Sequence, residues 1–94
     1  MDKLPEILRI QNSRRGYKSC ITVALNKLHR CQDLDLILFK KQENLINKWI
    51  TKIDDLNNEI ITKCALENIE VNLDEENEYL ISINEELSNI ENEI

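Results

Sequence analysis

Residues 39–64 read FKKQENLINKWITKIDDLNNEIITKC. Apolar side chains recur in this stretch at alternating steps of three and four residues, at Ile46, Trp49, Ile53, Leu56 and Ile60. Because one turn of α-helix takes about 3.6 residues, this spacing places them on one face and leaves mostly polar residues opposite. An amphipathic helix gains most of its stability from packing. The stretch therefore predicts a helix, over about residues 35–63, whose apolar face must be covered.

A second helix is predicted upstream, over about residues 14–31. Its apolar positions also alternate by four and three residues: Tyr17, Ile21, Ala24, Leu28 and Cys31. Asp33 or Asp35 is expected to cap the helix that follows. Residues 1–12 are expected to form a separate N-terminal segment, because Ser13 and Gly16 suggest a break or a new start.

A third helix is predicted over about residues 66–94, with a later start capped by Asn68 or Asn72 as the alternative. Its apolar positions form a heptad-like repeat, typical of coiled-coil packing: Leu66, Ile69, Leu73, Leu80, Ile83, Leu87, Ile90 and Ile94. Glu76 is the one polar interruption. A short turn is expected near residues 64–66, because the apolar stripe changes phase there. No glycine marks that turn, so one continuous helix is the alternative.

The composition agrees with a small all-α domain. The chain has 94 residues, one Gly, one Pro and 4% aromatic residues, so Leu and Ile must supply most of the core. The predicted fold is one domain, residues 1–94. It is an antiparallel, coiled-coil-like hairpin of the second and third helices with a shorter first helix alongside, making a three-helix bundle.

Charge is distributed unevenly along the chain. Residues 1–63 hold twelve Lys and Arg against eight Asp and Glu, a net charge of +4, whereas residues 64–94 hold ten acids and no Lys or Arg. The favoured interpretation is internal attraction, which should pair the second and third segments. The alternative is a basic first helix that binds nucleic acid, with Tyr17 stacking on a base. Its candidate contacts are Arg14, Arg15, Lys18, Lys27 and Arg30.

No residue pattern predicts catalysis, a metal or a cofactor. Cys20, Cys31, Cys64 and His29 lack the close spacing of a zinc site, and three widely spaced cysteines do not suggest a disulfide framework. Asp54 and Asp55 are adjacent and so do not face each other on a helix. Without a signal peptide or a long apolar run, the expectation is an intracellular chain, cytoplasmic or nuclear, that does not enter a membrane.

Two segments resemble a known family. The run Arg14-Arg15-Gly16-Tyr17-Lys18-Ser19-Cys20-Ile21-Thr22 and the later run Glu75-Glu76-Asn77-Glu78-Tyr79-Leu80-Ile81-Ser82-Ile83 flank a long Leu/Ile-patterned helix. This arrangement resembles the N-terminal Gag-like region of BEL/Pao-type retrotransposon polyproteins, over about residues 10–90. The capsid-like region, zinc knuckles and enzymes of such polyproteins have no counterpart here. The resemblance implies self-association or assembly, and no catalytic residue.

The function predicted from the sequence is therefore non-catalytic association, with a second copy or with another helical protein. The residues predicted to carry packing or association are Leu45, Ile46, Trp49, Ile53, Leu56, Ile60, Leu73, Leu80, Ile83, Leu87 and Ile90.

Overall fold

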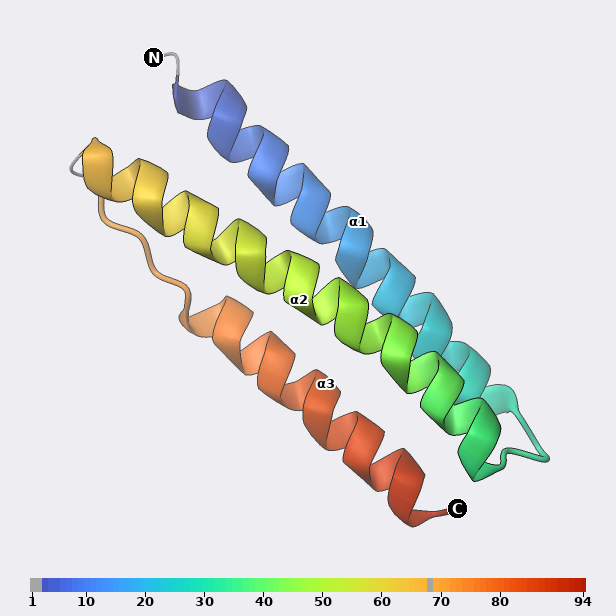
Figure 1. Ribbon diagram of the computed structural model, residues 1–94. Helices are drawn as coiled ribbons and strands as arrows, with labels where there is room; N and C mark the ends of the chain where they lie inside the picture. Colours follow the sequence, from blue (N-terminus) through green and yellow to red (C-terminus); the bar gives the residue numbers. More distant parts are fainter. Residues whose placement is uncertain (1–2, 68) are drawn as a thin grey trace.

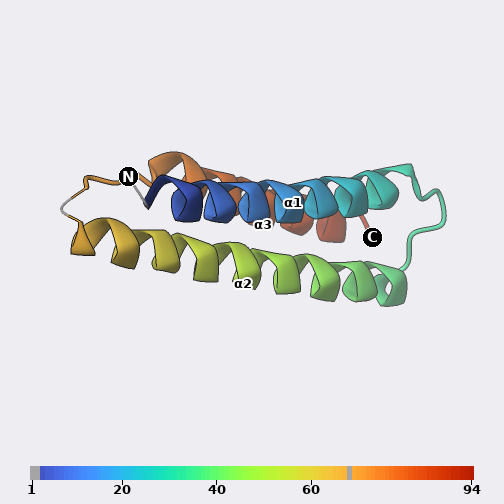
Figure 2. The same cartoon turned by 90° about the horizontal axis from the view of Figure 1, so that it is seen from above.

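The computed structural model describes the backbone of residues 3–67 and 69–94, and the side chains of residues 5–67 and 69–94. Over these residues the chain forms three α-helices, α1 (Lys3–Arg30), α2 (Leu36–Leu66) and α3 (Asp74–Asn92), each antiparallel to the one before (Figure 1). In Figure 2, α1 and α3 lie on the same side of α2. The molecule is a rod of 52 × 19 × 15 Å. The predicted all-α three-helix bundle is confirmed, with α1 shorter than α2.

The first helix is continuous, which corrects the prediction of a separate segment 1–12 and a break near Gly16. Within that segment, residues 1–2 lie outside the described part. Ile10 is fully buried with Ile60 and Cys64 of α2. This packing offsets the roughly 1 kcal/mol that a helical glycine costs relative to alanine. Arg14 lies mid-helix, so its charge does not oppose the dipole of a helix start.

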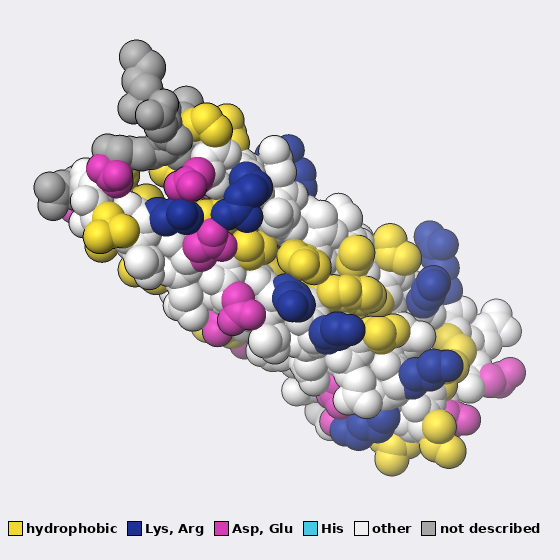
Figure 3. Space-filling model, turned by 45° about the horizontal axis from the view of Figure 1, so that its top comes forward, with side chains coloured by type: hydrophobic (Ala, Val, Ile, Leu, Met, Phe, Trp, Pro, Cys, Tyr) yellow, Lys and Arg dark blue, Asp and Glu magenta, His cyan; other side chains and the backbone are white. Residues whose placement is uncertain are grey.

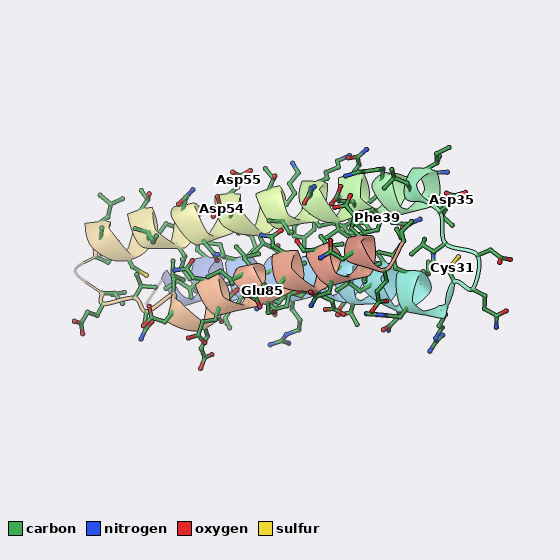
Figure 4. All side chains as sticks on the ribbon, turned by 90° about the horizontal axis from the view of Figure 1, so that it is seen from below. Cys31, Asp35, Phe39, Asp54, Asp55 and Glu85 are labelled. Atoms are coloured by element: carbon green, nitrogen blue, oxygen red, sulfur yellow. The ribbon has the colours of Figure 1, made fainter. Side chains whose placement is uncertain are left out.

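The connection between α1 and α2 follows the prediction. Asp35 caps α2, because its Oδ1 accepts a hydrogen bond of 2.8 Å from the backbone N–H of Leu38. Figure 4 shows Asp35 and Cys31 at this connection and Phe39 pointing from α2 into the space between the helices.

The connection between α2 and α3 differs from the prediction. A turn does separate the two helices, but α2 continues to Leu66 and α3 begins only at Asp74, not at residue 66. Three acids in the first turn of α3 favour a start there, because the N-terminus of a helix attracts negative charge. Asn72 supports it by accepting a hydrogen bond of 2.8 Å from the N–H of Asp74. Leu66 and Ile69 are therefore exposed and do not belong to the α3 stripe.

The core runs along the middle of the rod. Phe39, Ile46 and Ile53 recur every seven residues on α2 and are fully buried. α1 approaches α2 more closely than α3 does, which corrects the expectation that the second and third helices form the tighter pair. Among the predicted packing residues, the buried ones are Ile46, Ile53, Ile60, Ile83, Leu87 and Ile90. Those packed at the edge of the core are Trp49, Leu56, Leu73 and Leu80.

Leu45 is the exception among the predicted packing residues, because 41% of it is exposed. It lies one residue from the buried Ile46, on the flank of the stripe rather than within it. The apolar run before Phe39 is also exposed, with Ile37 exposed to 83%. The start of α1 does not cover this run, because the ion pair between Glu6 and Lys63 places that start at the opposite end of α2.

Candidate functional site

A layer of polar side chains crosses the bundle where the sequence shows its one polar interruption. Glu76 of α3 faces inward and is 16% exposed. Its Oε2 accepts a hydrogen bond of 2.8 Å from Nζ of Lys18, and its Oε1 lies 3.7 Å from Nε of Arg14. Both cations come from α1. The interruption at Glu76 is therefore an ion-paired position between α1 and α3.

Arg14 extends this layer to α2. Its Nη1 donates a hydrogen bond of 2.8 Å to Oδ1 of Asn57, which is buried with 3% exposure. Asn57 lies on the apolar stripe of α2, and sequence reasoning missed it. The available signal was a short polar residue four positions after Ile53, on the same face. We call Arg14, Lys18, Asn57, Glu76 and Tyr79 the polar layer.

Tyr79 completes the polar layer from α3. The ammonium group of Lys18 lies 4.6 Å from the centre of its ring, within the range of a cation–π contact. The structure records no hydrogen bond for its buried hydroxyl. Burial raises the pKa of Tyr79 above its ordinary value of 10.0, and the negative charges of Glu76 and Glu86 raise it further.

Tyr79 is expected to make stability sensitive to alkaline pH. Because the pKa of Tyr79 is raised in the folded chain, there is a pH range in which the folded state keeps the phenolic proton and the unfolded state has lost it. The stability linked to this group is present below about pH 10 and is lost as the pH rises through the raised pKa. Unfolding measured near pH 8 and near pH 11 should show a smaller alkaline loss for Tyr79→Phe than for wild type. The matched control is Tyr17→Phe; an equal reduction in both variants would refute the assignment.

The candidate nucleic-acid contacts fall into two groups. Arg14 and Lys18 are held by Glu76 inside the bundle. Arg15, Lys27 and Arg30 are exposed, and no ion pair is recorded for them within the described part of the chain. The structure therefore does not bring the five predicted contacts onto one free basic surface.

One hydrogen bond and one further ion pair link the basic residues 1–63 to the acidic residues 64–94. His29 Nε2 lies 2.6 Å from Glu86 Oε1, and Lys40 Nζ lies 2.9 Å from Glu91 Oε2. Hydrogen bonds to Glu91 and to Glu43 raise the pKa of Lys40. The acidic helix thus pairs with both α1 and α2, which corrects the expectation that it pairs mainly with the second segment.

The residues considered for metal or acid–base chemistry are spread out. Cys20 is exposed, Cys31 is half-buried near the α1–α2 connection, and Cys64 is buried near the opposite end of α2. Asp54 and Asp55 are exposed on α2 (Figure 4). Over the described residues, no group of three or more His, Cys, Asp or Glu is placed to hold a metal ion. No described helix is long and apolar enough to cross a membrane.

One side of the α1–α2 hairpin is not covered by α3. The ion pairs Arg9–Glu59, at 2.6 Å, and Glu6–Lys63, at 3.1 Å, mark this side. Residues that follow these ion-paired residues at intervals of three or four along each helix lie on the same side of the helix, and so belong to this face. We define the α1–α2 outer face by Gly16, Cys20, Val23, Leu45, Trp49 and Leu56.

The α1–α2 outer face has an apolar centre. Val23 is 55% exposed and Leu45 is 41% exposed, and the register set by the Arg9–Glu59 pair places them level with each other. Trp49 is half-buried between this surface and the core. Figure 3 shows hydrophobic side chains along the middle of this side of the rod, with Lys and Arg along its borders.

Gly16 also lies on this face and has no role in internal packing. A Cβ added there would meet no atom within 4 Å. Gly16 therefore leaves the surface of α1 without a side chain at a position where no described part of the chain packs against it.

Comparison with known proteins yields no relative, because no family model, no curated protein and no solved structure matches the chain. The resemblance to BEL/Pao-type Gag-like regions stays a prediction.

Proposed function

We propose that this chain is a non-catalytic helical module that binds a second copy of itself through the α1–α2 outer face. The observation that carries the proposal is the exposed apolar centre formed by Val23 and Leu45 beside the half-buried Trp49. Contiguous exposed apolar side chains rimmed by charge are a common feature of protein–protein interfaces. An aromatic side chain at the centre suits such an interface, because aromatic residues often dominate binding energy.

Charge favours a second copy as the occupant. Lys41, Lys48 and Lys52 lie beside Leu45 on α2, and no ion pair is recorded for them among the described residues. The same chain carries an excess of acid in residues 64–94. Complementary charge steers association and selects partners. Each copy therefore carries both an apolar surface bordered by lysines and an acidic segment, residues 64–94, of opposite charge.

Nucleic-acid binding has less support. Two of its five candidate contacts, Arg14 and Lys18, are occupied by Glu76. An assembly role is also what the resemblance to Gag-like regions implies, so the two lines of reasoning agree on association.

Association is expected to depend on Leu45. Sedimentation velocity over a concentration series should show wild type forming larger species as concentration rises. Leu45→Glu should weaken this association by at least about tenfold, because it places a carboxylate in an apolar contact. Circular dichroism should show an unchanged helical content, since Leu45 is substantially exposed in the single chain.

The matched control is Ile61→Glu. Ile61 is 43% exposed, close to the exposure of Leu45, and lies sixteen residues further along α2, which places it nearly on the opposite side of the helix. This variant should associate like wild type. The proposal fails if wild type remains a monomer at every concentration, or if both variants weaken association equally.

A further inference from the structure

The outward side of α3 carries an apolar side chain among acids. Ile81 is 58% exposed, and Glu78 and Glu85 lie three residues before and four residues after it, on the same face. Neither glutamate has an ion pair recorded within the described chain, whereas Glu76, Glu86 and Glu91 are paired with α1 or α2. We call Glu78, Ile81 and Glu85 the α3 outer face; Figure 4 shows Glu85 on this helix.

The α1–α2 outer face has the opposite character. Its apolar centre includes Leu45, and Lys41, Lys48 and Lys52 follow the same side of α2 at intervals of seven and four residues. Lys27 of α1 is also exposed beside Val23 and, in the described part, without an ion pair. This surface is thus an apolar strip bordered by ammonium groups. It is complementary in charge and polarity to the α3 outer face, where Ile81 is flanked by two carboxylates.

We propose that the α3 outer face of one copy docks on the α1–α2 outer face of the next copy. This inference rests on the proposed function and names the partner surface. The α3 of the first copy would lie along the α1–α2 hairpin of the second copy, on the side that the α3 of the second copy does not cover. The hairpin would then be packed between two acidic helices. Glu78 and Glu85 would then face the unpaired lysines, while Ile81 meets the apolar centre.

Symmetrical alternatives bring like charges together. Two α1–α2 outer faces packed on each other would oppose Lys41, Lys48 and Lys52 to a second set of lysines, and two α3 outer faces would oppose glutamates to glutamates. Like charges across an interface are unfavourable. Head-to-tail docking avoids this cost, and because it uses two different surfaces it leaves one of each free at the ends. Association should therefore continue beyond a dimer.

The test uses two variants of the 94-residue chain, each with one surface disabled. Leu45→Glu with Lys48→Glu blocks the α1–α2 outer face. Glu78→Gln, Ile81→Ser and Glu85→Gln together block the α3 outer face. Each variant alone should be a monomer in sedimentation velocity. An equimolar mixture should form a heterodimer and nothing larger, because only one intact interface remains. Wild type should form species beyond a dimer, and added salt should weaken them.

The control is Glu75→Gln with Glu93→Gln. It also removes two negative charges, but from exposed positions outside the α3 outer face, and it keeps Ile81. It should associate like wild type, whereas the blocked α3 variant should bind at least about tenfold more weakly. Circular dichroism melts check that every variant is folded.

The other outcomes separate the two proposals. If wild type is monomeric at all concentrations, the proposed function itself fails. If wild type associates and the α3 variant associates equally well, the partner surface is not α3 and only this inference is overturned. A dimer formed by the α3 variant alone would indicate symmetrical packing of the α1–α2 outer faces. Association by the variant with the blocked α1–α2 outer face would indicate contact between two α3 helices.

Discussion

Replacing Phe39 with alanine is expected to lower the free energy of unfolding by about 3–5 kcal/mol. Phe39 is fully buried and is the largest of the side chains enclosed in the core. Its removal would leave a cavity near the start of α2, close to the α1–α2 connection, in a chain too small to hold a large reserve of stability. Chemical denaturation followed by circular dichroism would measure the shift in midpoint.

The control is the neighbouring Ile37→Ala. Ile37 also belongs to the apolar run at the start of α2 but is 83% exposed, so its loss should change stability by no more than about 0.5 kcal/mol. Equal effects of the two substitutions would show that the apolar run does not pack as the structure places it. The measurement should be made at low concentration, where association adds little to apparent stability.

Replacing Glu76 with glutamine is expected to lower the free energy of unfolding by about 2 kcal/mol. The substitution keeps the shape of the side chain but removes the charge that faces Lys18 and Arg14. The side chain of Arg14 is 11% exposed, so it cannot turn fully to water when its partner is neutralised. Thermal and chemical denaturation would both report the loss.

Glu75→Gln provides the matched control for this prediction. Glu75 is exposed and adjacent, so the substitution removes the same charge from the chain without touching the polar layer. Its effect should stay within about 0.5 kcal/mol. A similar loss in both variants would mean that negative charge at the start of α3, rather than the contacts of Glu76, determines the result.

The polar layer is also expected to fix the position of α3 along the hairpin. Shifting α3 by seven residues would bring Ile83 to the place of Glu76 and leave Arg14 and Lys18 without a carboxylate. Replacing the layer with apolar side chains (Arg14→Met, Lys18→Met, Asn57→Leu and Glu76→Leu) should keep or raise stability but remove this constraint. The indole N–H of Trp49, the only tryptophan, should then give more than one NMR signal. A single signal in this variant would argue against the role.

Much of the fold follows from the periodicity of apolar residues. The stripe through Ile46, Ile53 and Ile60 predicts a helix and its buried face. Residues at this spacing line one side of a helix, and burying that apolar side stabilises the fold. The same rule gives Ile21 and Leu28 on α1 and Ile83 and Leu87 on α3.

The errors have both tertiary and local causes. Ser13 and Gly16 suggest a break or a new start, but the burial of Ile10 against α2 keeps α1 continuous. Leu66 and Ile69 fit the heptad pattern, yet the acids after Leu73 provide a better helix start. Leu45 is apolar but lies beside the stripe, where one residue changes the direction of the side chain by about 100°.

The candidate site is predictable only in part. Glu76 stands out as an interruption of an apolar stripe, but its partners come from a helix about sixty residues earlier and cannot be read from local sequence. The α1–α2 outer face depends on where α3 docks, because α3 covers one side of the hairpin and leaves the other free. No spacing rule decides which side is covered.

Over the described residues, three antiparallel helices place the start of α1 and the end of α3 at opposite ends of the rod. Glu6 lies beside Lys63 at one end of the rod, whereas Ile94 lies near Leu28 and Leu34 at the other. The rod is 52 Å long, so a fluorophore or fusion partner attached at each end is held at a distance of that order (Figure 1). The bundle would then act as a stiff spacer, and energy transfer between two such labels would read out its length directly.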